Sequence, residues 1–351
     1  MLLLNRLPRS SYPELYMKIL IATDAWEPQV NGVVKTLKNT IQKLEEMGHT
    51  VKVITPLDYW CFKVPFTKDI LTPYWVRTKT IKDKIEWADY IHISTEGTIG
   101  LAVRKYCIKK GYEFTTAYHT DIPNFFYKTF GFGLRLSKKY LRWFHNKSAC
   151  VMATTEQNIL ILKSYGFTAP IKIWSRGVDT DLFVPVAKEK SDRIRLVYCG
   201  RVSPEKGLND FVQLDNLYEK TIIGDGICLD SYQFIHPEIR FTGFLHGKEL
   251  ATELASHDIF VFPSKFDTFG LVNIEAMSCG LPVACYDCKG AGEIVSGGKR
   301  IGCASHDLNF AIKECHDLIY NNNCREHVLK NYTWNNATSQ FFGNLVRKVQ
   351  E

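Results

Sequence analysis

Long apolar runs are missing from this chain of 351 residues. No segment reaches the roughly 18 consecutive apolar residues that a membrane-spanning helix needs. The apolar start of the chain is too short for a signal peptide, and Arg6 and Pro8 interrupt it. We therefore expect a cytoplasmic protein without a transmembrane anchor, in which residues 1–16 are an extension before the first strand.

Paired cysteines at regular spacing are also missing, although the chain contains eleven cysteines. Cys285 and Cys288 form a C-x-x-C pair, but no second pair at zinc spacing accompanies it. The odd, scattered set argues against a disulfide framework and is typical of reduced thiols in the cytosol. We expect no structural metal at this pair.

The loop after the first apolar strand lacks the glycines of a dinucleotide-binding fingerprint. The strand "MKILIAT" begins at Met17 and is followed by "DAWEPQVNG", which does not contain the pattern G-x-G-x-x-G. This absence disfavours a Rossmann dehydrogenase. The net charge of +7 suits anionic ligands or an anionic membrane surface, and we expect no nucleic-acid partner.

Strand and helix patterns alternate along almost the whole chain. "MKILIAT", a helical stretch that stops at Gly48, and "HTVKVITP" form one βαβ unit, and this rhythm continues to about residue 184. A charged, proline-bearing linker follows at 184–193, after which the rhythm restarts with "IRLVYCG". We predict an α/β protein of two Rossmann-like, doubly wound domains, residues 17–184 and 185–333, that face a cleft. In the terminal segment 334–351, a helix to about residue 349 is expected to pack back on the first domain.

Two loops at the carboxyl edge of the second predicted sheet contain groups suited to a diphosphate. "YCGRVSPEKGL" places Arg201 and Lys206 after a strand, between glycines that permit close backbone approach. "FDTFGLVNIEAM" contains a helix start at 269–271, and the unpaired amides of such a start attract anions. Solvated surface loops would explain the cations alone, but two permanent cations beside an anion-binding helix start favour a bound diphosphate.

Two acids flank this helix start. Asp267 could act only as an N-cap, and Glu275 could be a surface ion-pair partner. Neither explanation accounts for an acid inside the apolar helix "LVNIEAM", which the core should bury. Acids on both sides of a phosphate site are suited to bind hydroxyls. We therefore predict a ligand with two polyol ends joined by a diphosphate, which is a nucleotide sugar.

The pair Asp267-x7-Glu275 resembles the E-x7-E motif of retaining glycosyltransferases of family 4, with aspartate in place of the usual first glutamate. Other segments are similar to that family and occur in its order: "EPQVNGVVKTL", "HISTEGTIG", "YHTDIP", "YLRWFHNKS", "SRGVDTDLF" and "GRVSPEKGL". The resemblance covers the chain from about Met17 to the terminal helix, and it is nearest to bacterial α-mannosyltransferases and glycolipid synthases. It implies the GT-B fold, with an acceptor domain followed by a donor domain.

The resemblance implies a role for each matching residue. The expected catalytic residues are His119 beside the anomeric centre, Arg201 and Lys206 on the diphosphate, and Asp267 on the donor sugar. A lone histidine at a strand end is more often structural, so the assignment of His119 depends on the resemblance. Glu275 would bind the ribose diol. The remaining donor-binding positions are Gly32 in a flexible loop, Gly243 and Phe244 in a base-reading loop, and the helix start with Phe269, Gly270, Leu271 and Val272.

The resemblance further implies transfer of a hexose from UDP-hexose or GDP-mannose, with the anomeric configuration retained. The acceptor would be a hydroxyl of a glycan or of a lipid such as diacylglycerol or phosphatidylinositol. No metal or other cofactor is expected, because Arg201 and Lys206 already supply positive charge. Asp179 and Asp181 imitate a metal-binding D-x-D motif, but we expect this pair to cap a turn.

Some alternatives remain open at this stage. A nucleotide-sugar epimerase or hydrolase on the same fold would need no acceptor, and an inactive module would bind the nucleotide sugar without turnover. The basic, aromatic segment 124–147 either lies on an anionic membrane or packs its aromatic side chains against the first sheet. Both explanations hold together if only the basic face of this segment is exposed.

Overall fold

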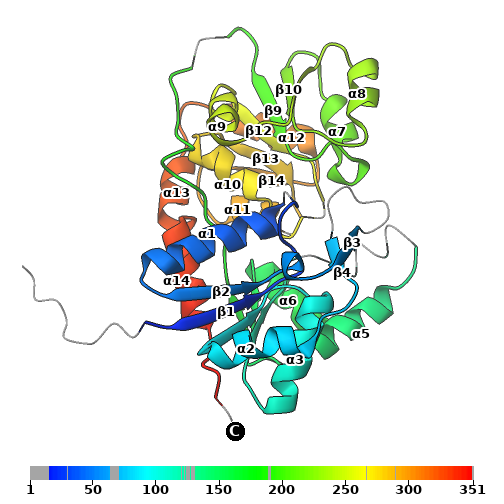
Figure 1. Ribbon diagram of the computed structural model, residues 1–351. Coiled ribbons are helices and arrows are strands. Elements are labelled where there is room, and N and C mark those ends of the chain that lie inside the picture. The colour runs from blue at the N-terminus through cyan, green and yellow to red at the C-terminus, as the bar shows by residue number, and fades with distance from the viewer. Residues whose placement is uncertain are drawn as a thin grey trace, which may run out of the picture.

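The computed structural model describes residues 16–29, 31–63, 71–119, 121, 123, 127, 131–188, 191–265, 267–288 and 290–349. The predicted N-terminal extension, apart from Tyr16, lies outside the described residues, as does most of the stretch 124–130. The described strands form two six-stranded sheets and a two-stranded ribbon. The sheets belong to two α/β domains, which lie one above the other in Figure 1.

The first domain is built on a parallel sheet in the order β2-β1-β5-β6-β7-β8. Its strands are β1 (Lys18–Ala22), β2 (Thr50–Ile54), β5 (Tyr90–Ile93), β6 (Thr115–Ala117), β7 (Cys150–Ala153) and β8 (Ile171–Ile173), beside the ribbon of β3 (Cys61–Lys63) and β4 (Leu71–Pro73). Neighbouring residues of β1 point to opposite faces. Ile19 lies in a buried cluster with side chains of the first helix, and Leu20 lies in the cluster on the other face. A continuous apolar strand is therefore needed here, because helices cover both faces of the sheet.

The second domain has a parallel sheet in the order β11-β10-β9-β12-β13-β14, which is the Rossmann order 3-2-1-4-5-6. Its strands are β9 (Arg195–Cys199), β10 (Glu219–Ile223), β11 (Arg240–Gly243), β12 (Ile259–Phe262), β13 (Val283–Tyr286) and β14 (Gly302–Ser305). Two separate buried clusters, one on each face, make its core. The fold-class prediction of two doubly wound α/β domains is confirmed.

Helices cover both faces of each sheet. In the first domain they are α1 (Gly32–Glu46), α2 (Thr78–Trp87), α3 (Thr98–Lys110), α5 (Leu134–His145) and α6 (Glu156–Ser164). In the second they are α7 (Leu208–Val212), α8 (Leu229–Ile235), α9 (Gly247–Ala255), α10 (Leu271–Ser278), α11 (Ala291–Ser296), α12 (Leu308–His316) and α13 (Cys324–Asn331), and α14 (Trp334–Asn344) follows. Within the described part of the chain, no helix has both the length and the apolar content needed to cross a membrane.

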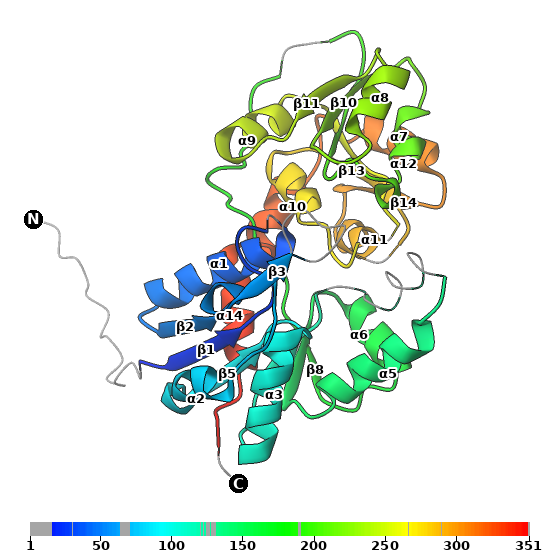
Figure 2. The same cartoon turned by 45° about the vertical axis from the view of Figure 1, so that its right-hand side comes forward.

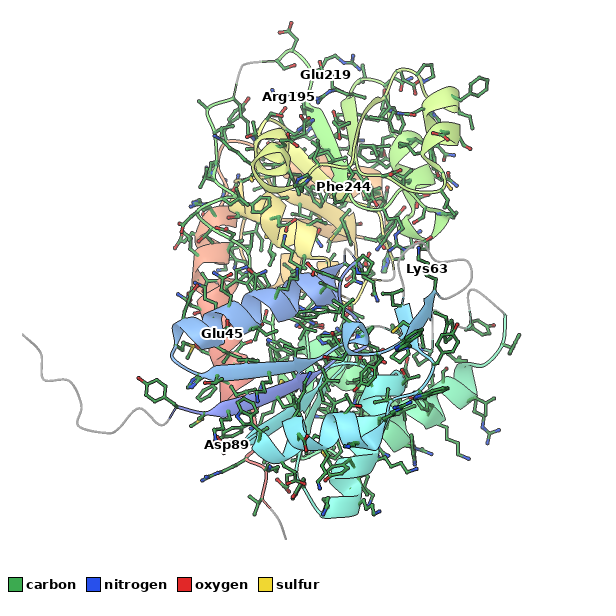
Figure 3. The ribbon with its side chains drawn as sticks, in the orientation of Figure 1. Glu45, Lys63, Asp89, Arg195, Glu219 and Phe244 are labelled. Atoms are coloured by element: carbon green, nitrogen blue, oxygen red, sulfur yellow. The ribbon has the colours of Figure 1, made fainter. Side chains whose placement is uncertain are left out.

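The carboxyl ends of the two sheets are turned toward each other. Figure 3 labels Arg195 and Glu219, the first residues of β9 and β10, at the end of the second domain that is farthest from the first. It labels Asp89, which directly precedes β5, at the opposite end of the molecule. The loops that follow the strands therefore meet between the domains. In open α/β sheets, ligands bind beside such loops.

The chain crosses between the domains twice, and the two crossings lie side by side. The Val178 amide donates to the Tyr332 carbonyl at 2.9 Å, and Val178 forms a parallel bridge with Thr333. After the second crossing, α14 packs beside α1 on the first domain (Figure 2). Phe341 on α14 is fully buried, and its ring centroid lies 4.7 Å from that of Trp174.

The terminal helix ends at Asn344, a few residues before its predicted end. Beyond it, Arg347 forms an antiparallel bridge with Tyr90 at the start of β5. Lys348 Nζ donates to two carbonyls in the last turn of α2, at 2.9 and 3.0 Å. A helix C-terminus attracts a cation, so these contacts outweigh the intrinsic tendency of the chain to continue the helix.

Candidate active site

The strand order of the second sheet reverses between β9 and β12, which makes this the switch point where doubly wound sheets bind ligands. Arg201 follows β9, and Lys206 ends the short 3₁₀ turn Pro204–Lys206 in the same loop. Asp267 lies in the loop after β12, and Glu275 lies on α10 just beyond it. The structure thus places both predicted motifs at one switch point.

The start of α10 has the geometry of an anion site. Gly270 precedes the helix in the left-handed conformation, with φ of 80°. A Cβ atom there would lie 2.5 Å from Asn273 Nδ2, so both the backbone and the available space require glycine. Phe269 is buried in the core, whereas Leu271 and Val272 are half-buried in the first turn. The Asn273 amide donates to the Gly270 carbonyl at 3.0 Å. The first amides of a helix, here those of Leu271 and Val272, have no acceptor within it and give this end a partial positive charge.

Lys206 and Asp267 form an ion pair at the mouth of this helix start. Lys206 Nζ donates to the two carboxylate oxygens of Asp267 at 2.7 and 3.0 Å. Each side chain remains 24% exposed, so a ligand can reach both. Arg201 is exposed and forms no ion pair with any acid that the structure describes. A diphosphate at α10 would therefore find one unpaired cation and one that it must share with Asp267.

Glu275 forms an ion pair across the two domains. Its side chain is only 5% exposed, and one carboxylate oxygen accepts from Nζ of Lys35 on α1. The same ammonium group lies 5.6 Å from the ring centroid of Phe183. The burial of Glu275 agrees with the sequence argument, but its partner was not predicted. Lys35 belongs to "VNGVVKTL", one turn beyond the loop, and nothing in the sequence indicates that α1 reaches the acid.

His119 is buried and neutral. Arg176 Nη2 lies 2.7 Å from His119 Nδ1. Because a guanidinium can only donate, Nδ1 accepts and the ring proton is on Nε2. That Nε2 is buried, and no described residue is its partner. Burial lowers the pKa of His119 well below its ordinary value, and the charge of Arg176 lowers it further. The ring can therefore donate one hydrogen bond from Nε2 to a ligand.

Arg176 was also missed by the sequence analysis. It is 6% exposed, and its Nη1 donates to the carbonyls of Trp174 and Ser175 at 3.1 and 3.3 Å. Burial lowers the pKa of this guanidinium to about 9. The motif "SRGVDTDLF" contains it, but a partner for His119 57 residues away in sequence could only be found from the fold.

Thr268 joins the second domain to the first beside His119. Its hydroxyl donates to the His119 carbonyl at 2.9 Å. Its own carbonyl accepts from the Thr154 hydroxyl at 3.0 Å and from Asn158 Nδ2 at 2.9 Å. The loop between the two predicted acids is therefore held by three groups of the other domain.

A second contact between the domains caps a helix. The carboxylate oxygens of Glu293, on α11, accept from the amides of Glu156 and Gln157 at 2.8 and 2.9 Å. These amides are in the first turn of α6, where negative charge is favourable. An acid of the second domain thus completes the end of a first-domain helix.

Gly32 is the first residue of α1 and lies opposite the start of α10. A Cβ atom at position 32 would be 3.2 Å from Leu271 Cδ1, so the backbone approaches closely here. Asn31 caps the helix by accepting from the amides of Val33 and Val34, each at 3.0 Å. The starts of α1 and α10 therefore face each other across the domains.

Gly243 and Phe244 lie at the carboxyl end of β11, the edge strand two positions from β9. Gly243 has φ of 73°, and its carbonyl accepts from the Gly224 amide at 2.8 Å. Phe244, which is labelled in Figure 3, is 59% exposed. No hydrogen bond among the described residues joins this loop to α10 or Lys206, so its base-reading role stays a prediction.

The Asp179–Asp181 pair is part of a turn. Asp179 Oδ1 accepts from the amides of Asp181 and Leu182 at 3.1 and 3.0 Å, which is the capping role expected from the sequence. Among the residues that the structure describes, no three histidine, cysteine or acidic side chains gather as a metal ion would need. Cys285 and Cys288 are not joined in a disulfide.

Comparison with known families assigns each domain. The family described as "Glycosyltransferase Family 4" matches residues 30–182, and the family described as "Glycosyl transferases group 1" matches residues 193–320. The chain belongs to the group 1, family 4 glycosyltransferases. The two matches fall on the first and the second domain, and together they span most of the described glycosyltransferase fold.

Characterised relatives cover most of this glycosyltransferase. The GDP-mannose-dependent alpha-mannosyltransferase of Mycobacterium tuberculosis is 27% identical over 310 residues, which is 80% of this chain and 82% of the relative. The alpha-monoglucosyldiacylglycerol synthase of Streptococcus pneumoniae is 25% identical over 378 residues, with 95% and 85% covered. The predicted resemblance to mannosyltransferases and glycolipid synthases is confirmed.

The solved structure of sucrose-phosphate synthase from Thermosynechococcus elongatus has a TM-score of 0.72 with 18% identity, and it covers 93% of this chain and 98% of its own. At this identity the likeness concerns the fold alone. The glycosyltransferase therefore has the GT-B fold that the motifs implied.

Proposed function

We propose that this glycosyltransferase moves one hexose from UDP-hexose or GDP-mannose to a hydroxyl of a membrane lipid such as diacylglycerol or phosphatidylinositol, and that it retains the anomeric configuration. The observation that carries the proposal is the grouping of Arg201, Lys206, Asp267 and Glu275 around the start of α10. The donor in the name of the GDP-mannose-dependent alpha-mannosyltransferase and the lipid in the name of the alpha-monoglucosyldiacylglycerol synthase support the two substrate classes.

In this proposal the donor exchanges the internal ion pairs for its own. Its diphosphate binds the first turn of α10 with Arg201 and Lys206. Asp267, which then shares Lys206 with the diphosphate, accepts from hydroxyls of the sugar. Glu275 accepts from the ribose hydroxyls in place of Lys35, and His119 Nε2 donates to a sugar oxygen near the anomeric carbon.

The bond between the anomeric carbon and the diphosphate oxygen breaks, and a bond to the acceptor oxygen forms on the same face of the sugar. The acceptor's proton passes to an oxygen of the leaving phosphate. Arg201, Lys206 and the α10 terminus stabilise the charge that develops on the diphosphate. These groups supply the positive charge, so we propose that no metal is required. The contacts at Thr268 close the domains and exclude water.

We place the enzyme in the cytoplasm, in peripheral contact with the anionic face of a membrane. Two observations support this placement: Leu136 and Trp143 on α5 are 73% and 53% exposed, and basic side chains surround them on the same helix. Of the predicted contact segment 124–147, this argument uses only residues that the structure describes.

The test is sugar incorporation into solvent-extractable lipid. Labelled UDP-glucose, UDP-galactose, UDP-glucuronate and GDP-mannose are supplied in turn with liposomes that contain diacylglycerol and phosphatidylinositol, in the presence of EDTA. We expect label in lipid from one donor. The anomeric proton coupling of that product, measured by NMR, is expected to match the configuration of the donor.

Two control variants make the assay specific to the site. Glu275→Ala is expected to abolish incorporation, while Glu249→Ala, an exposed acid on α9, leaves it unchanged. Free nucleotide without labelled lipid would indicate a soluble acceptor or a hydrolase and would reject the proposed lipid acceptor. An inverted product would reject the retaining mechanism alone, and loss of label with EDTA would reject metal independence.

A further inference from the structure

A second group of charges lies on the first domain, apart from the donor site. A hollow of about 350 Å³ is lined by Arg104 on α3, by residues of α5, and by those that directly follow α5. The lining residues of α5 and its end are Lys139, Arg142, Trp143, Asn146 and Lys147. In Figure 2, α6 lies between α5 and the second domain, so the hollow is not part of the interdomain site.

Arg104 is a fixed cation at the base of this hollow. It is only 5% exposed. Its Nε donates to the Phe144 carbonyl at 2.8 Å, and its Nη2 donates to the Trp143 carbonyl at 2.7 Å. The guanidinium also lies 4.0 Å from the ring centroid of Trp143. Arg104 thus satisfies carbonyls in the last turn of α5 and supplies the cation that this helix end favours.

The other three cations have no such role. Lys139, Arg142 and Lys147 are exposed, and none forms an ion pair with an acid in the described part of the chain. Elsewhere on the same domain, by contrast, Lys84 is paired with Asp58. Four positive charges around one hollow repel one another, and a bound anion would relieve this repulsion.

The shape and the neighbours of the hollow indicate the kind of anion. Arginine and lysine together suit a phosphate group, through forked hydrogen bonds and point charge. Leu136 and Trp143, seven residues apart, lie on the same side of α5 as Lys139 and are well exposed. Exposed apolar side chains beside cations are typical of a surface that meets lipid headgroups.

We propose that the hollow between α3 and α5 is a phosphate-binding site, separate from the donor site, in which Lys139, Arg142 and Lys147 bind the phosphate above Arg104. The phosphate is carried either by an anionic phospholipid or by a small soluble molecule. The hollow shares α5 with the proposed membrane contact, but none of its residues belongs to the proposed donor site. Failure of the hollow would therefore leave the proposed transfer reaction standing, and failure of the transfer reaction would leave the hollow standing.

The experiment compares two variants of the full chain that lose the same charge. The hollow variant is Lys139→Ala/Arg142→Ala/Lys147→Ala. The matched control is Lys79→Ala/Lys82→Ala/Lys109→Ala, which removes three exposed lysines from α2 and α3. All six side chains are exposed, and thermal melts are expected to overlay that of the unmodified chain.

The first arm is sedimentation with vesicles of phosphatidylcholine alone, with added phosphatidylglycerol, or with added oleate at equal charge. The unmodified chain is expected to bind phosphatidylglycerol vesicles best. The hollow variant should bind them at least about tenfold more weakly, because each cation near an anionic membrane surface adds to the attraction. The control variant should lose much less, since its charges are not in the hollow.

The second arm is titration with inorganic phosphate, followed by the fluorescence of Trp143. This signal is obtained by subtracting the spectrum of Trp143→Phe from that of the unmodified chain. A saturable change that the hollow variant lacks and the control variant keeps would support a soluble phosphate ligand. Selective loss in the vesicle arm alone would support the phospholipid.

Three results would overturn the proposal. The first is an equal loss of vesicle binding in both triple variants, which would indicate general surface charge. The second is equal binding to oleate and phosphatidylglycerol vesicles, since the hollow would then not recognise phosphate. The third is a hollow variant that behaves like the unmodified chain in both arms.

Discussion

The two halves of the proposed donor site hold their charges in opposite ways. In the second domain, Lys206 and Asp267 pair at a partly exposed surface where water and ligands can reach them. In the first domain, Arg176 is buried, and no acid among the described residues pairs with it. Its hydrogen bonds go to two backbone carbonyls and to neutral His119. The ion pair of the second domain is the exchangeable half of the site, because its partners can be replaced by a ligand. The buried contact between Arg176 and His119 is the fixed half.

This difference suits a site that must bind a charged donor and then release a charged product. Exposed ion pairs are weak, because their attraction is screened and ordering both side chains costs entropy, so a diphosphate can replace them at small cost. A buried guanidinium that makes three hydrogen bonds reorganises little, so it should hold His119 in one orientation. In the proposed mechanism, the first domain would hold His119 in place, and the second domain would provide the charge that changes partners.

Lys206→Met tests the exchangeable half, and it is expected to have the largest effect. Loss of the ammonium group removes charge stabilisation from the leaving diphosphate. We expect kcat to fall about a hundredfold, as when one preorganised donor is removed from an active site. Lys248→Met, an exposed lysine on α9, is the control and should leave kcat unchanged. If only KM for the donor rose, Lys206 would bind the ground state and the transition state equally. That result would contradict its role in stabilising the leaving diphosphate.

Glu275→Gln and Lys35→Met test whether the ion pair between the domains is a binding site or a structural link. A buried acid that binds the ribose should cost about 2 kcal/mol, or about thirtyfold in kcat/KM, when its charge is removed. Lys35 is 43% exposed, and its replacement should change kcat/KM by less than about threefold. Steady-state rates at varied donor concentration measure both. Equal losses of kcat/KM in the two variants would mean that the Lys35–Glu275 ion pair is a structural link and that Glu275 does not bind the ribose.

How far the sequence predicts this site depends on distance along the chain. Asp267 and Glu275 are eight residues apart, and the period of one helix is enough to place them near the same helix start. The loop with Arg201 and Lys206 could be added because parallel strands end at one sheet edge. The βα rhythm likewise predicted both domains, since each unit is local in sequence.

The interaction partners of these residues could not be predicted, because they lie far away along the sequence. Lys35 and Glu275 are 240 residues apart, and Arg176 and His119 are 57 apart. No periodicity links such positions, because the domain arrangement brings the first pair together and the strand order brings the second. The early end of α14 was also missed, because Lys348 finds the end of α2 only after the domain has folded.

The buried histidines near Arg176 lead to a prediction about how the stability of the protein depends on pH. His92 lies next to His119 around Trp174, with ring centroids 5.6 and 5.4 Å from that of the indole. His92 is fully buried, and burial lowers its pKa to about 3. Below pH 6.5 the unfolded chain therefore binds a proton that the folded chain does not, so the free energy of unfolding falls as the pH falls. His92 alone should account for about 1 kcal/mol between pH 6.5 and 5.5.

Urea unfolding at several pH values measures this slope. The comparison is between the unmodified chain and His92→Phe, which removes the titrating ring and the contact with Thr115. His92→Phe is expected to be less stable at pH 7.5 but to lose less stability on acidification. If the free energy of unfolding changed with pH equally in both chains, His92 would be protonated in the folded state. The buried histidine would then be charged, which would contradict this prediction.

Glu293→Gln tests the contact between the two halves and should have the smallest effect. The glutamate caps α6 with charge and two acceptor oxygens, whereas glutamine keeps one acceptor and no charge. Charge at an accessible helix end contributes about 0.3–1 kcal/mol, so kcat/KM should fall about threefold if this contact forms in the closed, active arrangement. Glu314→Gln on α12 is the exposed control. A rise in kcat would contradict this expectation. It would mean that the contact of Glu293 with α6 slows the opening of the two domains, and that this opening limits product release.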